Sequence, residues 1–200
     1  MSDENKIDSQ MLLEPMNMLS LYARGAFPMA DKGGEIHWYM PKVRAVIPLN
    51  KYNVPRSLKA HIKKMNFEYR IDSATFDVIK LCAQRDETWI SKELIAAYKN
   101  LIKLGNLHSV EVFSEKKLVG GLFGITYRGA FFGESMFSLV EQASKAALVY
   151  LIEHLRKKGF VLLDVQFATD HLKMFGAVEI DFEAFTDKLI EAYLKEVYFR

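Results

Sequence analysis

Two polar residues interrupt an apolar stretch near the C-terminal end of the chain. Asp164 and Gln166 lie within Val-Leu-Leu-Asp-Val-Gln-Phe at residues 161–167, which otherwise has the composition of a buried strand. Positions two apart on a strand share a face, so both side chains are expected to point the same way. A buried carboxylate is costly unless it is partnered, and charges inside strands therefore gather at sites or in fixed networks. Two interpretations stay equally open: a catalytic pair, or an Asp that ties down a loop beside a strand-end Gln.

A second carboxylate, Glu134, ends a predicted strand over residues 130–134 and would suit a cationic substrate. Its neighbour Ser135 lies in Gly-Glu-Ser-Met-Phe, which lacks the second glycine of a nucleophile elbow, so a nucleophilic serine is disfavoured. The lone Cys82 is interpreted as a packing residue. The five histidines share no i, i+4 pair and no cysteine neighbour, which predicts no metal site: His37, His61, His108, His154 and His171.

The formal charge of +2 conceals a basic segment. Residues 51–70 carry six Lys or Arg against one Glu, and Arg56, Lys59 and Lys63 fall on one face of a predicted helix. Such a face either binds along a phosphate backbone or is a solvent-exposed helix face without a partner, and both interpretations stay open. Nearby aromatic residues, among them Trp38 and Trp89, can stack on a base or fill the core.

The first ten residues lack the features of a secretory signal or transit peptide. The longest apolar run, at 146–152, is far shorter than the roughly 20 residues of a membrane-spanning helix. With the single cysteine, these features predict a cytoplasmic protein.

Hydrophobic periodicity and turn residues predict alternating helices and strands. Helices are expected at 11–23, 56–65, 73–83 with Ser73 as N-cap, 91–104, from a Ser138–Glu141 capping box to about 157, at the short turn 170–174, and at 182–195. Extended segments are expected at 27–29, 35–40, 44–49, 67–71, 109–113, 118–127, 130–134, 160–167 and 177–180.

An antiparallel meander, a long helix, a central strand and a final helix form the order of a GNAT-like acyltransferase core, an α+β fold. Users of acetyl-coenzyme A carry a glycine-rich pyrophosphate loop before the long helix. The corresponding segment, 133–141, has a glutamate and no second glycine, which disfavours acetyl-coenzyme A as the donor.

Eight segments together resemble the bacterial leucyl/phenylalanyl-tRNA–protein transferases over nearly the whole chain. They are Tyr-Ala-Arg-Gly-Ala-Phe-Pro (22–28), Pro-Lys-Val-Arg-Ala-Val (41–46), Thr-Trp-Ile (88–90), His-Ser-Val-Glu-Val (108–112), Leu-Val-Gly-Gly-Leu-Phe-Gly (118–124), Phe-Gly-Glu-Ser-Met-Phe-Ser (132–138), Ala-Ser-Lys-Ala-Ala-Leu (143–148) and Leu-Asp-Val-Gln-Phe-Ala-Thr-Asp-His (163–171). The resemblance implies transfer of Leu or Phe, and less well Met, from aminoacyl-tRNA to proteins with N-terminal Arg or Lys, which feeds N-degron degradation. It implies no cofactor, and we expect a monomer.

The resemblance also implies a domain division and site roles. We expect a flexible acidic tail at 1–9, a reduced N-terminal domain at 10–43, and a GNAT-like catalytic domain at 44–200 with the basic helix near 55–65. By positional match, Asp164 and Gln166 are the catalytic pair, and Glu134 binds the acceptor. The aminoacyl side-chain pocket would comprise Leu122, Met136, Leu151 and Leu163; the tRNA 3′ end would meet Met29, Trp38 and Trp89; the tRNA phosphates would meet Arg56, Lys59, Lys63 and Lys64. Met29 stands where many members have a Trp that stacks on the terminal adenine.

The implied reaction is aminolysis of an ester. Gln166 is expected to accept a hydrogen bond from the attacking amine, while Asp164 polarises and orients it. Proton removal is left open between Asp164, a water and the vicinal ribose hydroxyl. The alternatives are a GNAT-like N-acetyltransferase that uses acetyl-coenzyme A and a tRNA-binding module without catalysis.

Overall fold

The computed structural model describes residues 9–85 and 88–200 of the 200-residue chain, so the predicted acidic tail lies, apart from Ser9, outside the described residues. The N-terminal part contains α1 (Ser9–Leu12), α2 (Pro15–Ala23) and a two-stranded antiparallel sheet of β1 (Phe27–Ala30) and β2 (Ile36–Tyr39). The single helix predicted over 11–23 is wrong, because Pro15 begins a new helix at a position where its missing N–H costs nothing.

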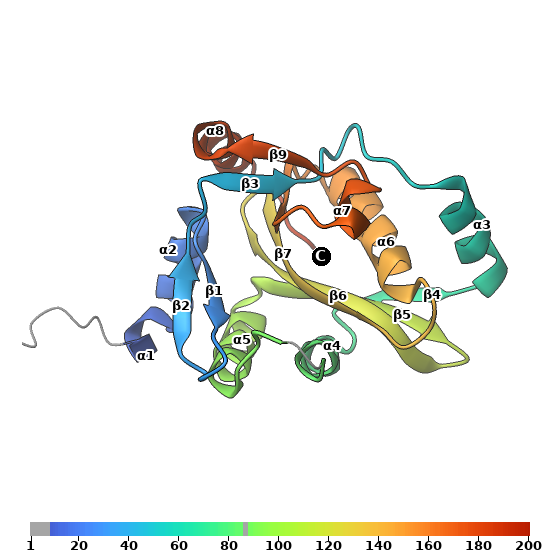
Figure 1. Ribbon diagram of the computed structural model, residues 1–200, viewed down its shortest axis with the longest axis horizontal. Helices are drawn as coiled ribbons and strands as arrows, with labels where there is room; N and C mark the ends of the chain where they lie inside the picture. The colour runs from blue at the N-terminus through green and yellow to red at the C-terminus, as the bar shows by residue number, and fades with distance from the viewer. Residues whose placement is uncertain (1–8, 86–87) are drawn as a thin grey trace, which may run out of the picture.

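A seven-stranded mixed sheet forms the centre of the molecule, in the order β4-β5-β6-β7-β8-β3-β9 (Figure 1). In that order the strands are Glu68–Ile71, Leu107–Ser114, Lys117–Tyr127, Ala130–Ser138, Leu162–Gln166, Val43–Val46 and Val178–Asp181. The predicted meander is β5-β6-β7, and the parallel pair β7-β8 is connected through α6 (Ala143–Lys158). The α+β fold class and the predicted order of its elements are confirmed.

The remaining helices are α3 (Arg56–Met65), α4 (Thr75–Ala83), α5 (Lys92–Leu104), α7 (Asp170–Lys173) and α8 (Phe182–Tyr193). Two predicted caps are wrong. Ser73 uses its hydroxyl on Glu111, and α4 begins two residues later. Ser138 is the last residue of β7, and α6 begins only at Ala143 after a left-handed Gln142.

The two faces of the large sheet are covered by different helices (Figure 1). One apolar core joins the sheet to α2, α4, α5 and α8, while the other joins it to α6 with contributions from α3 and α7. Because α2 shares the first core, the N-terminal segment packs directly against the strands that carry the candidate site. No helix in the described part of the chain has the length and apolar character needed to cross a membrane.

Candidate active site

The candidate site lies where two parallel strands stop pairing. β7 and β8 are in register from Ala130 opposite Leu162 to Phe132 opposite Asp164. The residues that follow on each strand line a cavity of about 90 Å³, which α6 and α7 close from one side. Its lining is Leu122, Phe123, Gly133, Glu134, Ser135, Met136, Leu148, Leu151, Leu163, Val165, Gln166 and Leu172. The cavity therefore has a long apolar wall and a polar end with Glu134, Ser135 and Gln166.

Gln166 has an unusual backbone conformation at the polar end of the cavity. Its φ is +58°, and the N–H of Phe167 donates to the carbonyl of Val165 at 2.7 Å, a tight turn that ends β8. A side chain in this region of φ is strained, and such strain collects at functional sites. The side-chain amide nitrogen of Gln166 is buried and has no hydrogen-bond partner among the described residues. An unpartnered buried donor is costly, so this amide is available to a bound molecule.

Asp164 is held by an arginine that the sequence reasoning missed. The Nε and Nη2 atoms of Arg44 donate to the two carboxylate oxygens of Asp164 at 2.8 and 2.7 Å, and both side chains are fully buried. Arg44 Nη1 also donates to the Gly25 carbonyl at 2.6 Å. The guanidinium carbon lies 4.6 Å from the ring centre of Phe27 and 4.7 Å from that of Phe185. A bidentate pair of this kind fixes geometry as well as charge.

A hydrogen bond connects the Arg44–Asp164 ion pair to the strained turn at Gln166. Asp164 Oδ1 accepts a hydrogen bond from the backbone N–H of Gln166 at 3.0 Å, so Arg44, Asp164 and Gln166 form one chain of contacts. Gln166 leaves regular strand geometry and lines the cavity, whereas Asp164 is fully buried against Arg44 and is not part of the lining. That the two residues form a catalytic pair stays a prediction.

Glu134 is partly buried in the middle of β7, not at a strand end as predicted. Tyr22 Oη donates to its Oε1 at 3.0 Å, and Tyr98 Oη donates to its Oε2 at 3.0 Å. Burial raises the pKa of Glu134 to about 7 from the usual 4.5, although the two hydrogen bonds act in the opposite direction. The pKa values of both tyrosines are raised well above 10.0 by burial, so both remain donors.

The structure brings together all four residues expected for the aminoacyl pocket. Leu122, Met136, Leu151 and Leu163 line the one cavity that also contains Glu134 and Gln166, and they come from β6, β7, α6 and β8. Residues far apart in sequence therefore form a continuous apolar wall, and its role in binding the aminoacyl side chain stays a prediction.

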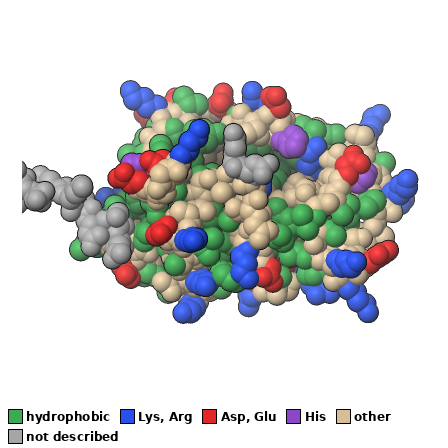
Figure 2. All heavy atoms as spheres, turned by 60° about the horizontal axis from the view of Figure 1, so that its bottom comes forward, with side chains coloured by type: hydrophobic (Ala, Val, Ile, Leu, Met, Phe, Trp, Pro, Cys, Tyr) green, Lys and Arg blue, Asp and Glu red, His purple; other side chains and the backbone are tan. Residues whose placement is uncertain are grey.

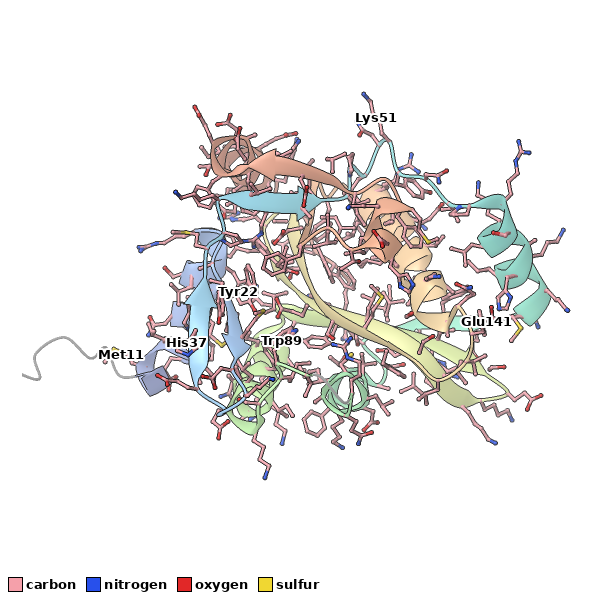
Figure 3. All side chains as sticks on the ribbon, viewed as in Figure 1. Met11, Tyr22, His37, Lys51, Trp89 and Glu141 are labelled. Carbon is pink, nitrogen blue, oxygen red and sulfur yellow. The ribbon has the colours of Figure 1, made fainter. Side chains whose placement is uncertain are left out.

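The three residues expected at the tRNA 3′ end, Met29, Trp38 and Trp89, lie together at the N-terminal sheet. All three are partly buried and pack on the core that contains Tyr22. Of these residues, Tyr22 and Trp89 are labelled in Figure 3. The Trp38 ring meets Tyr22 edge-on at 5.9 Å, and the Trp89 carbonyl accepts the Ala30 N–H at 3.0 Å. Tyr22, which contacts Trp38, also donates to Glu134 and so connects this group to the polar end of the cavity.

The basic helix α3 forms as predicted and ends with the left-handed Asn66. Arg56, Lys59, Lys63 and Lys64 are all exposed, and within the described residues none has an ion-pair partner. By contrast, Figure 2 shows Lys and Arg scattered over the face that carries α4 and α5, with acidic side chains between them.

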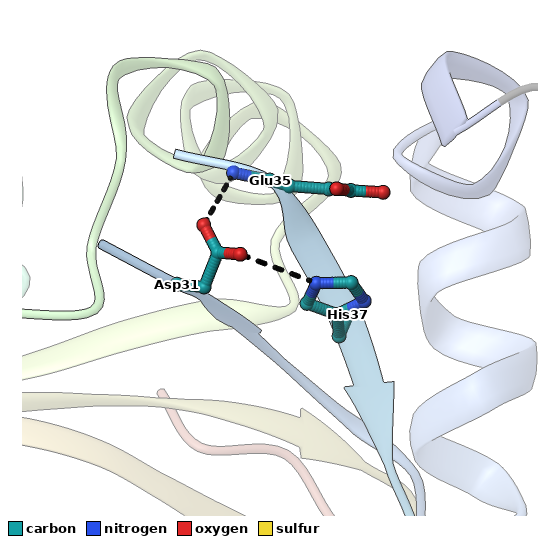
Figure 4. A group of neighbouring side chains, drawn as sticks. All are labelled: Asp31, Glu35 and His37. Atoms are coloured by element: carbon teal, nitrogen blue, oxygen red, sulfur yellow. Dashed lines mark hydrogen bonds and ion pairs between the residues drawn. The ribbon is translucent and has the colours of Figure 1, made fainter. Parts of the chain in front are cut away.

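Three other features do not belong to this site. Burial raises the pKa of the Cys82 thiol to about 12, as expected for a packing residue. A hollow of about 610 Å³ lies beside the C-terminal segment, where Asp72 is already bound by His108 and Arg200. Asp31 and Glu35, in the exposed turn between β1 and β2, lie close to His37 on β2 (Figure 4), and Asp31 accepts the Gly33 and Glu35 N–H groups and so stabilises the turn.

Comparison with known proteins decides the family. The family model described as leucyl/phenylalanyl-tRNA protein transferase matches residues 46–190, and the model for its N-terminal domain matches residues 11–42. The chain belongs to this family. Leucyl/phenylalanyl-tRNA–protein transferases from Rubrobacter xylanophilus and Herpetosiphon aurantiacus are 47% and 46% identical to it, over 91% and 90% of this chain and 96% and 94% of theirs. The relative from Paramagnetospirillum magneticum is 45% identical over 91% of this chain and 90% of its own.

Among solved structures, a GCN5-related glucosamine N-acetyltransferase region aligns with a TM-score of 0.49 and 11% identity, over 83% of this chain and 22% of the other. That likeness is too weak to bear on what this leucyl/phenylalanyl-tRNA protein transferase family member does.

Sequence reasoning missed three residues of the site in this family member. Arg44 is a lone charge beside the apolar Ala-Val-Ile of a strand, and that isolation is a signal for a buried partner. Tyr22 and Tyr98 occupy apolar helix faces, where a tyrosine is expected in the core. Only the fold shows that both hydroxyls meet one carboxylate.

Proposed function

We propose that this protein transfers Leu or Phe, and less well Met, from aminoacyl-tRNA to the α-amino group of proteins that begin with Arg or Lys. The observation that carries the proposal is a single cavity whose apolar wall leads to Glu134 and Gln166, in a chain of the leucyl/phenylalanyl-tRNA protein transferase family. The acyl donor and the cationic acceptor would meet at the polar end of that cavity.

The donor side chain would occupy the apolar wall. Leu122, Met136, Leu151 and Leu163 provide no hydrogen-bonding group from their side chains, so an unbranched or γ-branched apolar chain is favoured over a polar one. A pocket of this kind distinguishes one methylene by only about 1–3 kcal/mol, which is why some Met transfer is expected.

The tRNA would extend from the N-terminal sheet to α3. Met29, Trp38 and Trp89 would receive the 3′ end, where aromatic side chains can stack on bases. The unpaired cations of α3 would contact phosphates: Arg56, Lys59, Lys63 and Lys64. We also propose that the protein is a cytoplasmic monomer, with residues 10–43 and 44–200 as its N-terminal and catalytic domains.

The reaction would be aminolysis of the aminoacyl ester. The acceptor amine attacks the ester carbonyl, a tetrahedral oxyanion forms, and the ribose oxygen leaves. Gln166 would contact the reacting atoms through its side-chain amide nitrogen, which is buried and has no partner in the part of the chain that the structure describes. Asp164, fixed by Arg44, would hold the turn that aims this amide.

Glu134 would bind the cationic amino terminus of the acceptor. A carboxylate at the polar end of the cavity supports this role, and the hydroxyls of Tyr22 and Tyr98 orient both of its oxygens. Glu134→Gln is expected to weaken the preference for Arg- and Lys-starting acceptors over an Ala-starting one. An unchanged preference would contradict the role.

One assay tests the proposed function. The protein is incubated with an Arg-starting peptide and either labelled Phe-tRNA, labelled Leu-tRNA or labelled acetyl-coenzyme A, with the same peptide acetylated at its amino terminus as control. Label is expected to move from both aminoacyl-tRNAs to the free peptide only. Transfer from acetyl-coenzyme A alone, or tRNA binding without transfer, would contradict the proposal.

A further inference from the structure

Two carboxylates lie next to the proposed reaction centre, and they have different partners. Both oxygens of Asp164 accept hydrogen bonds from the fully buried guanidinium of Arg44, so neither faces the cavity free of a protein cation. Glu134 has no guanidinium or ammonium partner among the described residues, and its ligands are two tyrosine hydroxyls.

We propose that Glu134 is a catalytic residue that takes a proton from the α-ammonium group of the acceptor and so generates the amine that attacks. This inference rests on the proposed aminoacyl transfer and deepens it. The geometry that carries it is the shared cavity, in which Glu134 and the unpartnered amide of Gln166 line the same polar end.

The protons balance without any further reagent. The acceptor enters as an ammonium with three N–H bonds, and the amide product keeps one. The first proton goes to the Glu134 carboxylate before attack and later to solvent. The second leaves the nitrogen of the tetrahedral intermediate and neutralises the ribose oxygen as the C–O bond breaks, so an N–C bond replaces an ester bond.

The surroundings of Glu134 suit a base that works near neutral pH. Its pKa of about 7 reflects burial, with the hydrogen bonds from Tyr98 and Tyr22 opposing that effect. The remaining charges that act on it are the negative Asp164, which raises the pKa, and Arg44, which lowers it. A base whose pKa lies near the working pH combines a usable ionised fraction with real basicity.

The test measures single-turnover transfer from Phe-tRNA to saturating Arg-starting peptide between pH 6.0 and 8.5, for wild type and Glu134→Gln. Without Glu134, the rate must follow the free amine of the peptide, whose pKa is about 7.7–8.0. The defect of Glu134→Gln is therefore expected to be about tenfold at pH 6.5 and within about threefold at pH 8.5. A defect that is the same at every pH, as loss of acceptor binding alone would give, overturns the inference.

Two milder variants keep the inference testable if Glu134→Gln does not fold. Tyr22→Phe and Tyr98→Phe each remove a hydrogen bond to the carboxylate, so the acid limb of the wild-type profile should move to higher pH in both. Tyr69→Phe is the matched control, since Tyr69 stacks on Tyr150 at 4.8 Å outside the cavity lining, and its profile should equal that of the wild type. An unmoved limb in both site variants overturns the inference. Wild type that transfers no label at any pH refutes the proposed function itself.

Discussion

The carboxylates of Glu134 and Asp164 belong to neighbouring strands, yet their surroundings differ in kind. Asp164 on β8 is fully buried and bound by a guanidinium that lies over the rings of Phe27 and Phe185. Glu134 on β7 opens into the cavity and is bound by neutral hydroxyls. The bidentate guanidinium fixes the position of Asp164, whereas burial raises the pKa of Glu134 to about 7, so Glu134 can change its charge near neutral pH. We propose that this difference separates a positioning residue, Asp164, from a catalytic one, Glu134.

The largest effect on stability is expected from a variant that breaks the ion pair between Arg44 and Asp164. Arg44→Met leaves a fully buried carboxylate without its partner and should lower the free energy of unfolding by about 3–5 kcal/mol, measured by urea denaturation. Arg44→Met/Asp164→Leu is the control, because it removes both charges. The double variant should regain much of the stability while transfer stays impaired. Wild-type stability in the single variant would contradict the importance of the pair.

The turn that the pair supports gives the second test. Gln166→Ala and Gln166→Gly both remove the side-chain amide, so each should slow transfer by roughly 10²–10⁴-fold. Glycine tolerates the φ of +58°, and Gln166→Gly should therefore be about 1 kcal/mol more stable than Gln166→Ala. Thermal unfolding and single-turnover rates check the two effects separately. Near-normal transfer in both variants would show that the amide does not contact the reacting atoms.

A change at Glu134 is expected to have a smaller effect on stability, and at high pH the variant should gain stability where Arg44→Met loses it. A carboxyl whose pKa rises from 4.5 in the unfolded chain to about 7 in the fold destabilises the protein as pH rises through that window, since the unfolded state ionises first. Gln does not titrate. The melting temperature of Glu134→Gln minus that of wild type should therefore be more positive at pH 8 than at pH 5. A difference independent of pH would mean that the fold does not raise the pKa of Glu134.

The smallest effect is expected from the lysines of α3, which lie outside the surroundings of both carboxylates and would act on tRNA binding. Lys59→Gln/Lys63→Gln should lower the salt dependence of tRNA binding by about 2 in the slope of log affinity against log salt concentration, because each phosphate contact contributes about 1. Lys103→Gln, an exposed lysine in the last turn of α5, is the control and should leave the slope unchanged. Equal slopes in all proteins would identify the α3 lysines as a solvated face.

Local pattern was sufficient for much of the fold. The helix at 56–65 has the predicted bounds, and Ser91 caps α5 through the Leu94 N–H. The antiparallel meander was predictable because the sequence changes to a period of two along its first strand, where apolar and polar residues alternate. The cap at Ser73 failed because its hydroxyl binds a tertiary partner, Glu111. The capping box at Ser138 failed because β7 extends through Ser138 and α6 begins five residues later, so its hydroxyl accepts the Ser144 N–H from outside the helix.

The sequence predicted some residues of the site but not the long-range contacts that hold them. The positional match identified residues that the structure brings to one cavity, including Leu122, Glu134 and Gln166. It could not find the partners of the carboxylates, because Arg44 and Asp164 are 120 positions apart and Tyr22 lies 112 positions from Glu134. The strain at Gln166 was equally invisible, since strand periodicity assumes regular φ at every residue.

The most direct test of the different roles of the two carboxylates compares Asp164→Asn with Glu134→Gln in the single-turnover transfer assay across pH 6.0–8.5. We expect that the defect of Glu134→Gln shrinks as pH rises and that Asp164→Asn slows transfer by a similar factor at every pH. A defect of Asp164→Asn that disappears at high pH, together with one of Glu134→Gln that does not, would reverse the assignment.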